Sequence, residues 1–280
     1  MESIDAMLDA LPYRGDGTGR PEGLALPPGR MPRRQGRRPL KRWRYVGVYG
    51  PEVLLCAGVA RVAGMPQAFW AVWDRGQQRL WERTSTRRSG VALPDGAVRV
   101  ADREVAVDLV LEPAGEPVEV VSAHGGSYIW TRKRPLHAIG LLTVEGRSTA
   151  IDAFGLLDDS AGYHARRTAW EWSAGVGVGT DGAQVAWNLV AGVHDAPVRS
   201  ERTVWVDGGA LEVAPVHFAP GLEGVGELRF EPEAERVRRD DLLLLASDYR
   251  QPFGTFAGTL PDGTELRAGY GVMEHHAARW

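Results

Sequence analysis

The sequence has a single cysteine, Cys56, and therefore cannot form an internal disulfide. Cys56 lies in the apolar run 53–57, where a cysteine is usually a small buried side chain rather than a reactive thiol. No apolar run approaches the roughly 18 residues that span a bilayer. The acidic start, residues 1–9, lacks the basic and apolar regions of a secretion signal. These absences predict a cytoplasmic protein with no transmembrane segment.

The chain also has little net charge, although one segment is strongly basic. The formal charge of −3 gives no overall attraction to nucleic acid. Residues 30–44, however, carry eight basic and no acidic side chains. Such an arm either binds an anionic surface or RNA, or is a solvated N-terminal segment that lies over the acidic remainder of the chain. Pro32 and Pro39 interrupt any helix that could present a basic face, which favours the second interpretation, a solvated segment.

What the chain does have is strand and turn chemistry, together with ten tryptophans and 35 glycines. From residue 41 onward, short runs rich in Val, Leu and aromatic residues alternate with turn sequences such as 94–96 and 261–263. No segment keeps a helical period. The pattern predicts an all-β protein of two tandem antiparallel barrels or curved sheets, with little helix and an irregular N-terminal arm. The expected division is an arm at 1–40, a first β unit at 41–135 and a second at 136–280.

Residues 168–178 show the clearest period of two in the sequence. Their even positions are apolar, including Trp170 and Trp172, and their odd positions are mostly polar or small. Trp187 belongs to the next predicted strand, where Asn188 faces the opposite side. These tryptophans either form the apolar wall of a ligand site or simply fill a core.

The segment 158–167 just before that strand is dense in reactive side chains. Asp158 and Asp159 are adjacent, so in a strand they point to opposite sides and cannot act as a carboxylate pair. An aspartate facing an apolar lumen would have a raised pKa and could donate a proton; alternatively Asp158 bonds the backbone of a turn. The candidates for proton transfer are Asp158, Tyr163 and His164. Arg166 and Arg167 either bind an acidic group of a ligand or lie on the surface.

Near the end of the chain, Glu274 and His276 would share one face of a strand while His275 points away. Two ligands do not make a closed metal site, so no metal is expected, and both residues are candidates for ligand binding. The glycines at 175, 177 and 179 have no helix pattern behind them, which argues against a dinucleotide site. No cofactor is expected.

Several segments carry a resemblance to a known family: 41–45, 158–172, 253–260 and 271–280. They resemble an uncharacterised bacterial family, a domain of unknown function. More distantly, the chain is similar to the double lipocalin-like proteins of the hydroxyneurosporene synthase (carotenoid hydratase) and AttH group. This resemblance implies two lipocalin-like barrels side by side, and a terpenoid or polyketide substrate that is hydrated or cyclised. Asp158 and the pair Trp170/Trp172 stand where the group has its aspartate motif and Trp-x-Trp strand, with Asp159 and Ser160 replacing the group's aromatic and His neighbours.

Together these observations predict a protein that binds a hydrophobic small molecule, a lipid, terpenoid or polyketide, in a Trp-lined barrel cavity. The site would either catalyse an acid-driven hydration or cyclisation, or serve a non-enzymatic carrier. A third alternative is an interaction module that binds anionic surfaces or RNA through its basic arm. Aromatic residues do not alternate with basic ones as in single-strand platforms, so the nucleic-acid signal is not strong. The sequence leaves the oligomeric state open.

Overall fold

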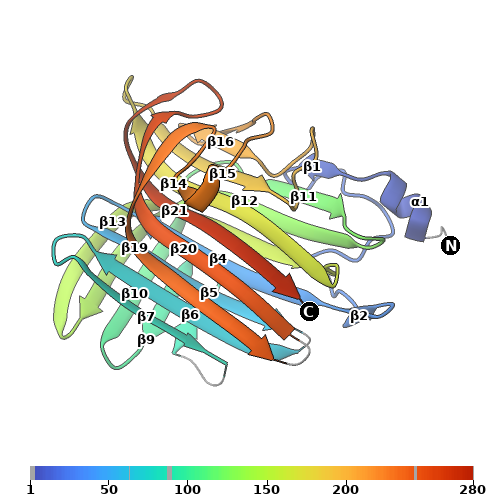
Figure 1. Cartoon of the computed structure of the whole chain (residues 1–280), viewed down its shortest axis with the longest axis horizontal. Helices are drawn as coiled ribbons and strands as arrows, with labels where there is room; N and C mark the ends of the chain where they lie inside the picture. Colours follow the sequence, from blue (N-terminus) through green and yellow to red (C-terminus); the bar gives the residue numbers. More distant parts are fainter. Residues whose placement is uncertain (1–3, 63, 87–89, 243–244, 280) are drawn as a thin grey trace.

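The computed structural model describes residues 4–62, 64–86, 90–242 and 245–279. Strands account for 66% of the chain and helix for 2%, and two large curled antiparallel sheets form the body of the molecule (Figure 1). The predicted all-β, double lipocalin-like class is confirmed. Trp280, which ends the segment that resembles the family, lies outside the described residues.

The first sheet has 11 strands in the order β7-β6-β5-β4-β13-β12-β10-β9-β8, with β11 pairing β12 and β1 pairing β11. It curls until β8 contacts β5 and β6. Its strands are β1 (Tyr13–Gly15), β4 (Lys41–Tyr49), β5 (Val53–Val62), β6 (Met65–Asp74), β7 (Arg79–Ser85), β8 (Val91–Ala92), β9 (Ala97–Ala101), β10 (Val105–Pro113), β11 (Val118–Ala123), β12 (Tyr128–Val144) and β13 (Arg147–Gly162).

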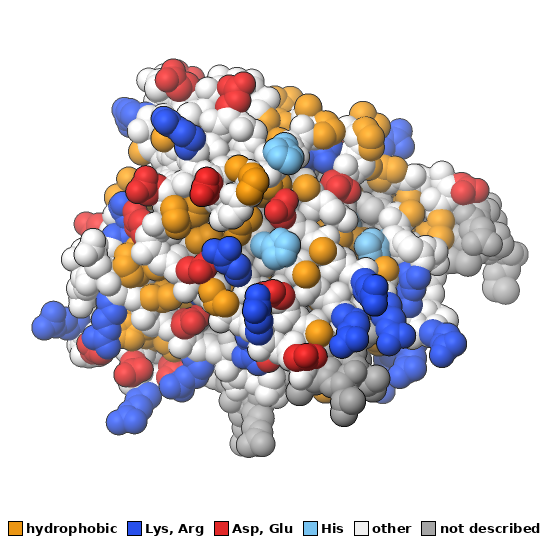
Figure 2. All heavy atoms as spheres, in the orientation of Figure 1, with side chains coloured by type: hydrophobic (Ala, Val, Ile, Leu, Met, Phe, Trp, Pro, Cys, Tyr) orange, Lys and Arg blue, Asp and Glu red, His pale blue; other side chains and the backbone are white. Residues whose placement is uncertain are grey.

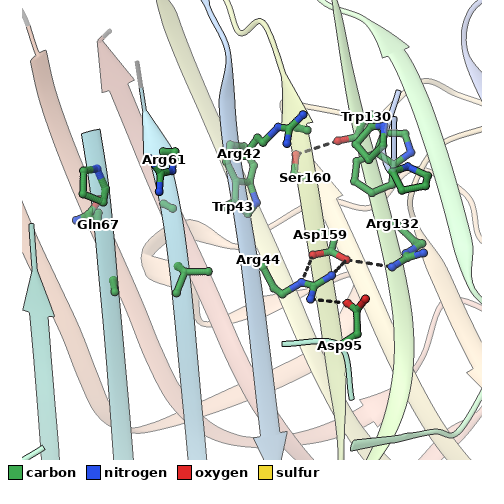
Figure 3. A pocket seen from close by; sticks show the side chains of 17 residues that line it. Arg42, Trp43, Arg44, Arg61, Gln67, Asp95, Trp130, Arg132, Asp159 and Ser160 are labelled. Atoms are coloured by element: carbon green, nitrogen blue, oxygen red, sulfur yellow. Dashed lines mark hydrogen bonds and ion pairs between the residues drawn. The ribbon is translucent and has the colours of Figure 1, made fainter. Parts of the chain in front are cut away.

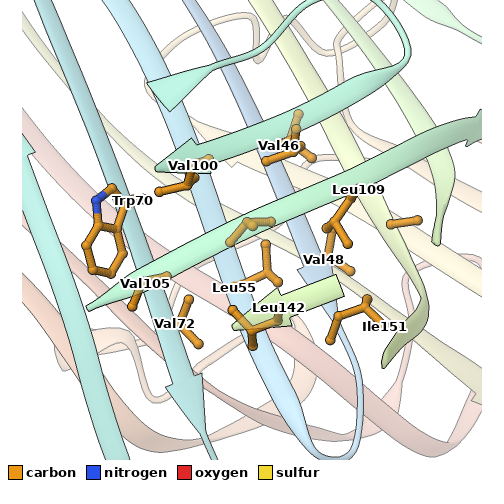
Figure 4. Packing of buried hydrophobic residues seen from close by; sticks show 14 of the residues in the cluster. Val46, Val48, Leu55, Trp70, Val72, Val100, Val105, Leu109, Leu142 and Ile151 are labelled. Atoms are coloured by element: carbon orange, nitrogen blue, oxygen red, sulfur yellow. The ribbon is translucent and has the colours of Figure 1, made fainter. Parts of the chain in front are cut away.

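The concave face of the first sheet encloses an apolar core. Val48 of β4 and Trp70 of β6 pack there against Val100 of β9 and Leu109 of β10 (Figure 4). β-branched and aromatic residues favour strands, and placing them at every second position buries them on one face.

The second sheet has eight strands in the order β17-β16-β15-β14-β21-β20-β19-β18 and is also curled. Its concave side is filled by large side chains, among them Trp187, Phe230 and Phe256. Its elements are β14 (Arg167–Gly179), β15 (Gln184–Ala191), β16 (Thr203–Val206), β17 (Gly209–Glu212), the 3-10 turn η1 (Pro220–Leu222), β18 (Gly224–Val225), β19 (Glu227–Leu242), β20 (Leu245–Thr259) and β21 (Glu265–Arg279).

The two sheets pack against each other through a separate core. On β4, Val46 and Val48 face the first sheet's own core, while Tyr45 and Tyr49 face the second sheet. Trp172 of the second sheet packs edge-on against Tyr45, with ring centroids 5.5 Å apart. In Figure 1, β20 and β21 accordingly lie in front of β4 and β5.

The sheets divide between Gly162 and Arg167, later in the chain than the join predicted at residues 135/136. β12 and β13 form one long hairpin of the first sheet, and Pro135 lies inside it. The ammonium group of Lys133 in this hairpin is buried between carboxylates, which lets a charged residue occupy the middle of a strand.

The arm at residues 1–40 is irregular, as predicted, and is packed against the first sheet. It contains α1 (Ile4–Asp9), β1, and the small hairpin of β2 (Arg34–Gln35) and β3 (Arg38–Pro39). Leu26 and Met31 are buried beside Tyr128 and Trp130 of β12. Four of its arginines are exposed: Arg30, Arg33, Arg34 and Arg37. Lys and Arg side chains gather at the end of the molecule where β2 lies (Figure 2). Within the described part of the chain, no helix has the length and apolar character to cross a bilayer.

Candidate functional site

A pocket of about 630 Å³ opens at one end of the first sheet (Figure 3). Strands β4, β5, β6, β12 and β13 supply most of its walls. The lining residues are Pro27, Pro28, Arg42, Trp43, Arg44, Val59, Ala60, Arg61, Pro66, Gln67, Ala68, Asp95, Trp130, Arg132, Asp159, Ser160 and Ala161.

The period of two explains why Arg42 and Arg44 both reach this pocket. Arg42 and Arg44 lie on the same face of β4 as Val46 and Val48, which are in the core of the first sheet. The pocket is therefore the open end of the concave face whose deeper part is filled. Val59 of β5 packs against that core from the pocket side, so apolar surface continues from the pocket inward.

One ion-pair network crosses the pocket. Arg44 donates from Nε to Asp159 Oδ1 at 2.6 Å and from Nη2 to Asp159 Oδ2 at 3.0 Å, a bidentate pair. Its Nη1 donates to Asp95 at 2.7 Å, and Arg132 donates to Asp159 at 3.2 Å. The bond from Arg44 lowers the pKa of Asp95. Both carboxylates are therefore already paired with arginine.

A second concentration of ionisable groups is buried between the two sheets, and we call it the inter-sheet cluster. Its members are Lys133, Asp158, Trp170, Trp172, Asn188, Glu201, Arg236, Tyr249, Gln251, Glu274 and His276. Lys133 bonds Asp158 at 2.7 Å and lies 3.5 Å from Glu201. Burial alone would lower the pKa of Lys133, but these two carboxylates raise it above its ordinary value. Burial raises the pKa of Glu201 to about 7.

Glu274 occupies the other end of the inter-sheet cluster. Its carboxylate accepts from Trp170 Nε1 at 2.9 Å and from Gln251 Nε2 at 3.0 Å. Burial raises the pKa of Glu274 to about 7 and lowers the pKa of His276, whose ring lies 4.4 Å from that of Trp170, to about 4. At neutral pH the carboxyl of Glu274 is therefore partly protonated and the imidazole of His276 is neutral.

The comparisons with known proteins concern both the pocket and the inter-sheet cluster. A family model described as "Domain of unknown function (DUF2804)" matches residues 91–280, more than half of the chain. The chain belongs to the DUF2804 family. The match contains the whole inter-sheet cluster, but only part of the pocket, because β4, β5 and β6 precede residue 91. No curated protein matches the sequence.

Two solved structures show what this DUF2804 chain is similar to in fold. An AttH-like protein from Nitrosomonas europaea is 14% identical, covers 91% of this chain and 97% of its own, and has a TM-score of 0.51. Kievitone hydratase from Nectria haematococca is 13% identical, covers 84% and 88%, and has a TM-score of 0.50. At these identities the likeness shows the fold alone. The family and the distant AttH relation expected from the sequence are confirmed.

The structure brings six of the predicted site residues of this DUF2804 chain into the inter-sheet cluster: Asp158, Trp170, Trp172, Asn188, Glu274 and His276. Asp158 and Asp159 do point to opposite faces, one toward Lys133 and the other into the pocket. Trp172 Nε1 donates to Asn188 Oδ1 at 2.7 Å, so two of the predicted ligand-binding residues are hydrogen-bonded to each other.

The other predicted residues lie elsewhere. The Tyr163 hydroxyl donates to the backbone carbonyl of Pro32 at 2.8 Å and so attaches the arm, while His164 is buried with its ring 5.1 Å from that of Trp43. Arg166 and Arg167 are exposed. Among the described residues, no contact joins Asp158, Tyr163 and His164 into one proton-transfer site, and their catalytic role stays a prediction.

The 630 Å³ pocket is not the tryptophan-walled cavity expected in the second unit. Trp187 is fully buried, donates to Ser173 at 3.0 Å and packs against Phe256, so the second sheet's concave side is a filled core at this point. Trp170 and Trp172 pack between the sheets. The pocket lies instead at the open end of the concave face of the first sheet.

Lys133, Glu201, Arg236 and the arginines of the pocket were not among the residues predicted from the sequence. For Arg42 and Arg44 a signal existed, since residues 42–45 do alternate basic and aromatic side chains, contrary to the expectation that no strand would. A strand with that alternation presents its arginines on one face and its aromatic rings on the other. Glu201 and Arg236 carry no such signal, because only the tertiary packing brings them to their partners.

Proposed function

We propose that this protein binds a small molecule with an apolar body in the pocket of the first sheet. The observation that supports this most is the pocket itself, whose volume falls within the roughly 300–1,000 Å³ typical of ligand sites. Its walls combine apolar surface from Val59, Pro66 and Ala68 with a few charged groups held in place by one another. This is the composition that fixes a ligand's orientation while burying its body.

Filling the pocket tests the proposal. The Val59→Trp variant places an indole in the cavity, and we expect its affinity for the neutral apolar dye Nile red to fall about tenfold or more, which corresponds to ~1.4 kcal/mol. Dye fluorescence titrated with purified protein measures this. The matched control is Val110→Trp, because Val110 is 58% exposed on β10 and does not line the pocket. Equal dye binding by both variants would exclude the pocket as the site.

A second candidate function, acid–base chemistry between the sheets, is favoured by Glu274. A carboxyl whose pKa is about 7 can donate a proton at neutral pH, and this one is held directly against the ring of Trp170. Hydration or cyclisation of an apolar substrate needs such a donor, and one fold neighbour is named a hydratase. A carrier would return its bound molecule chemically unchanged, so mass analysis of ligand recovered after incubation separates the two roles.

A further inference from the structure

Two arginines at the mouth of the pocket lie on neighbouring strands, and neither is paired with a carboxylate of the described residues. Arg42 of β4 is the direct cross-strand partner of Arg61 of β5, and both side chains are exposed. Directly opposite residues on one face of an antiparallel pair have Cβ atoms about 5 Å apart, and like charges there are destabilising. No ion pair or hydrogen bond reaches either guanidinium within the described ranges of the chain.

Arg44 shows that an arginine on the same strand forms ion pairs where carboxylates are within reach. Arg44 lies two residues further along β4, and it is held by Asp159 and Asp95. The pocket therefore has four arginines against two aspartates, a formal balance of +2. Since both aspartates are already bound by arginine, the uncompensated charge resides at the Arg42–Arg61 end.

Two further donors on this face lack an acceptor. Trp130 and Arg132 lie at alternate positions of β12, and both line the pocket. Among the described residues, the indole Nε1 of Trp130 and the Nε of Arg132 are buried without a hydrogen-bond partner. Buried N–H groups ordinarily have one, so the lining has more donors than the protein has acceptors for them.

We propose that the ligand carries an anionic head group, a carboxylate or a phosphate, which binds between Arg42 and Arg61 while its apolar body lies against Val59 and Ala68. This inference rests on the function proposed above and adds the chemical class of the ligand. An oxyanion between two guanidinium groups makes charge-assisted hydrogen bonds with both and removes their mutual repulsion. A cationic head group has no free carboxylate in this pocket to receive it.

Displacement of Nile red by ligands with the same chain and different heads tests the inference. Dodecanoate, dodecyl phosphate, dodecanol and inorganic phosphate are titrated separately against the protein–dye complex. We expect the better of the two anionic amphiphiles to bind at least about tenfold more tightly than dodecanol, as for a hydrogen bond to a charged group. The stronger of the two identifies the head as carboxylate or phosphate.

The double substitution R42Q/R61Q provides a second test of the inference. It should weaken the preferred anion about tenfold and leave the affinities for Nile red and dodecanol unchanged within twofold. The variant is expected to fold, because both side chains are exposed and repel each other. The control R99Q removes an exposed arginine of β9 that does not line the pocket, and it should change neither affinity.

The possible results distinguish the two claims. If dodecanol matches the anions, or if R42Q/R61Q binds them as the unmodified protein does, the anionic-head inference is overturned while the apolar pocket stands. Displacement by inorganic phosphate alone, with no advantage for the amphiphiles, would equally overturn it. If Nile red does not bind the unmodified protein at all, the proposed function itself fails.

Discussion

Replacing Lys133 with methionine should lower the free energy of unfolding by about 3–5 kcal/mol, the usual cost of breaking a buried ion pair from one side. Lys133 is 4% exposed and is the only cation within salt-bridge distance of Asp158 among the described residues. Its removal leaves Asp158 and Glu201 as like charges in a low dielectric. Urea denaturation at pH 8, followed by tryptophan fluorescence, measures the loss.

The loss in Lys133→Met should shrink as the pH is lowered toward 5, because Glu201, whose pKa burial raises to about 7, then binds a proton instead of relying on a cation. Arg99→Met is the matched control, since Arg99 forms an exposed pair with Asp108, and such pairs contribute about 0–1 kcal/mol. A cost below about 1 kcal/mol for Lys133→Met, similar to the control, would show that the cluster is not the buried charge network described above.

Glu274→Gln should remove part of the protein's pH dependence of stability. The pKa of Glu274 is about 7 in the folded protein and about 4.5 when unfolded, so the folded state holds its proton more tightly. The stability that this provides is present below pH 4.5 and is lost as the pH rises through 7. Between pH 5 and pH 8 the loss is about 2–3 kcal/mol, and the glutamine variant should lack it.

The free energy of unfolding is measured at pH 5 and at pH 8 for the unmodified protein and for Glu274→Gln. The change between the two pH values is then compared between the two proteins. Any constant cost of placing an amide against Trp170 and Gln251 cancels in that comparison. Glu265→Gln, at an exposed position at the start of β21, is the control and should leave the pH dependence as it is. An unchanged pH dependence in Glu274→Gln would mean that this carboxyl does not stay protonated in the folded protein.

The sequence was sufficient for the strand content and for the strand faces on which several candidate side chains lie, because period-two patterns are local. None of the predicted site residues lines the pocket of the first sheet. The alternation at 168–178 placed Trp170 and Trp172 on one face, and the adjacency of Asp158 and Asp159 separated them correctly. Glu274 and His276 were also placed together on β21, and both lie in the inter-sheet cluster.

The same patterns could not say what each face packs against. The sequence pattern of a tryptophan-bearing face is the same whether that face lines a cavity, fills a core or packs between two sheets. Trp187 fills the core of the second sheet, and Trp172 packs between the two sheets. The curl of the first sheet depends on pairings between strands distant in sequence, such as β13 with β4. Pairings of that kind also decide that the open end of the concave face lies beside Arg42.

The most direct measurement is a crystal structure with bound 12-bromododecanoate, in which the anomalous signal of bromine locates the chain end. We predict that the bromine lies in the pocket on the side of Val59 and Ala68, with the carboxylate within hydrogen-bonding distance of Arg42 and Arg61. Bromine between the two sheets beside Trp170, with the pocket of the first sheet empty, would contradict this account.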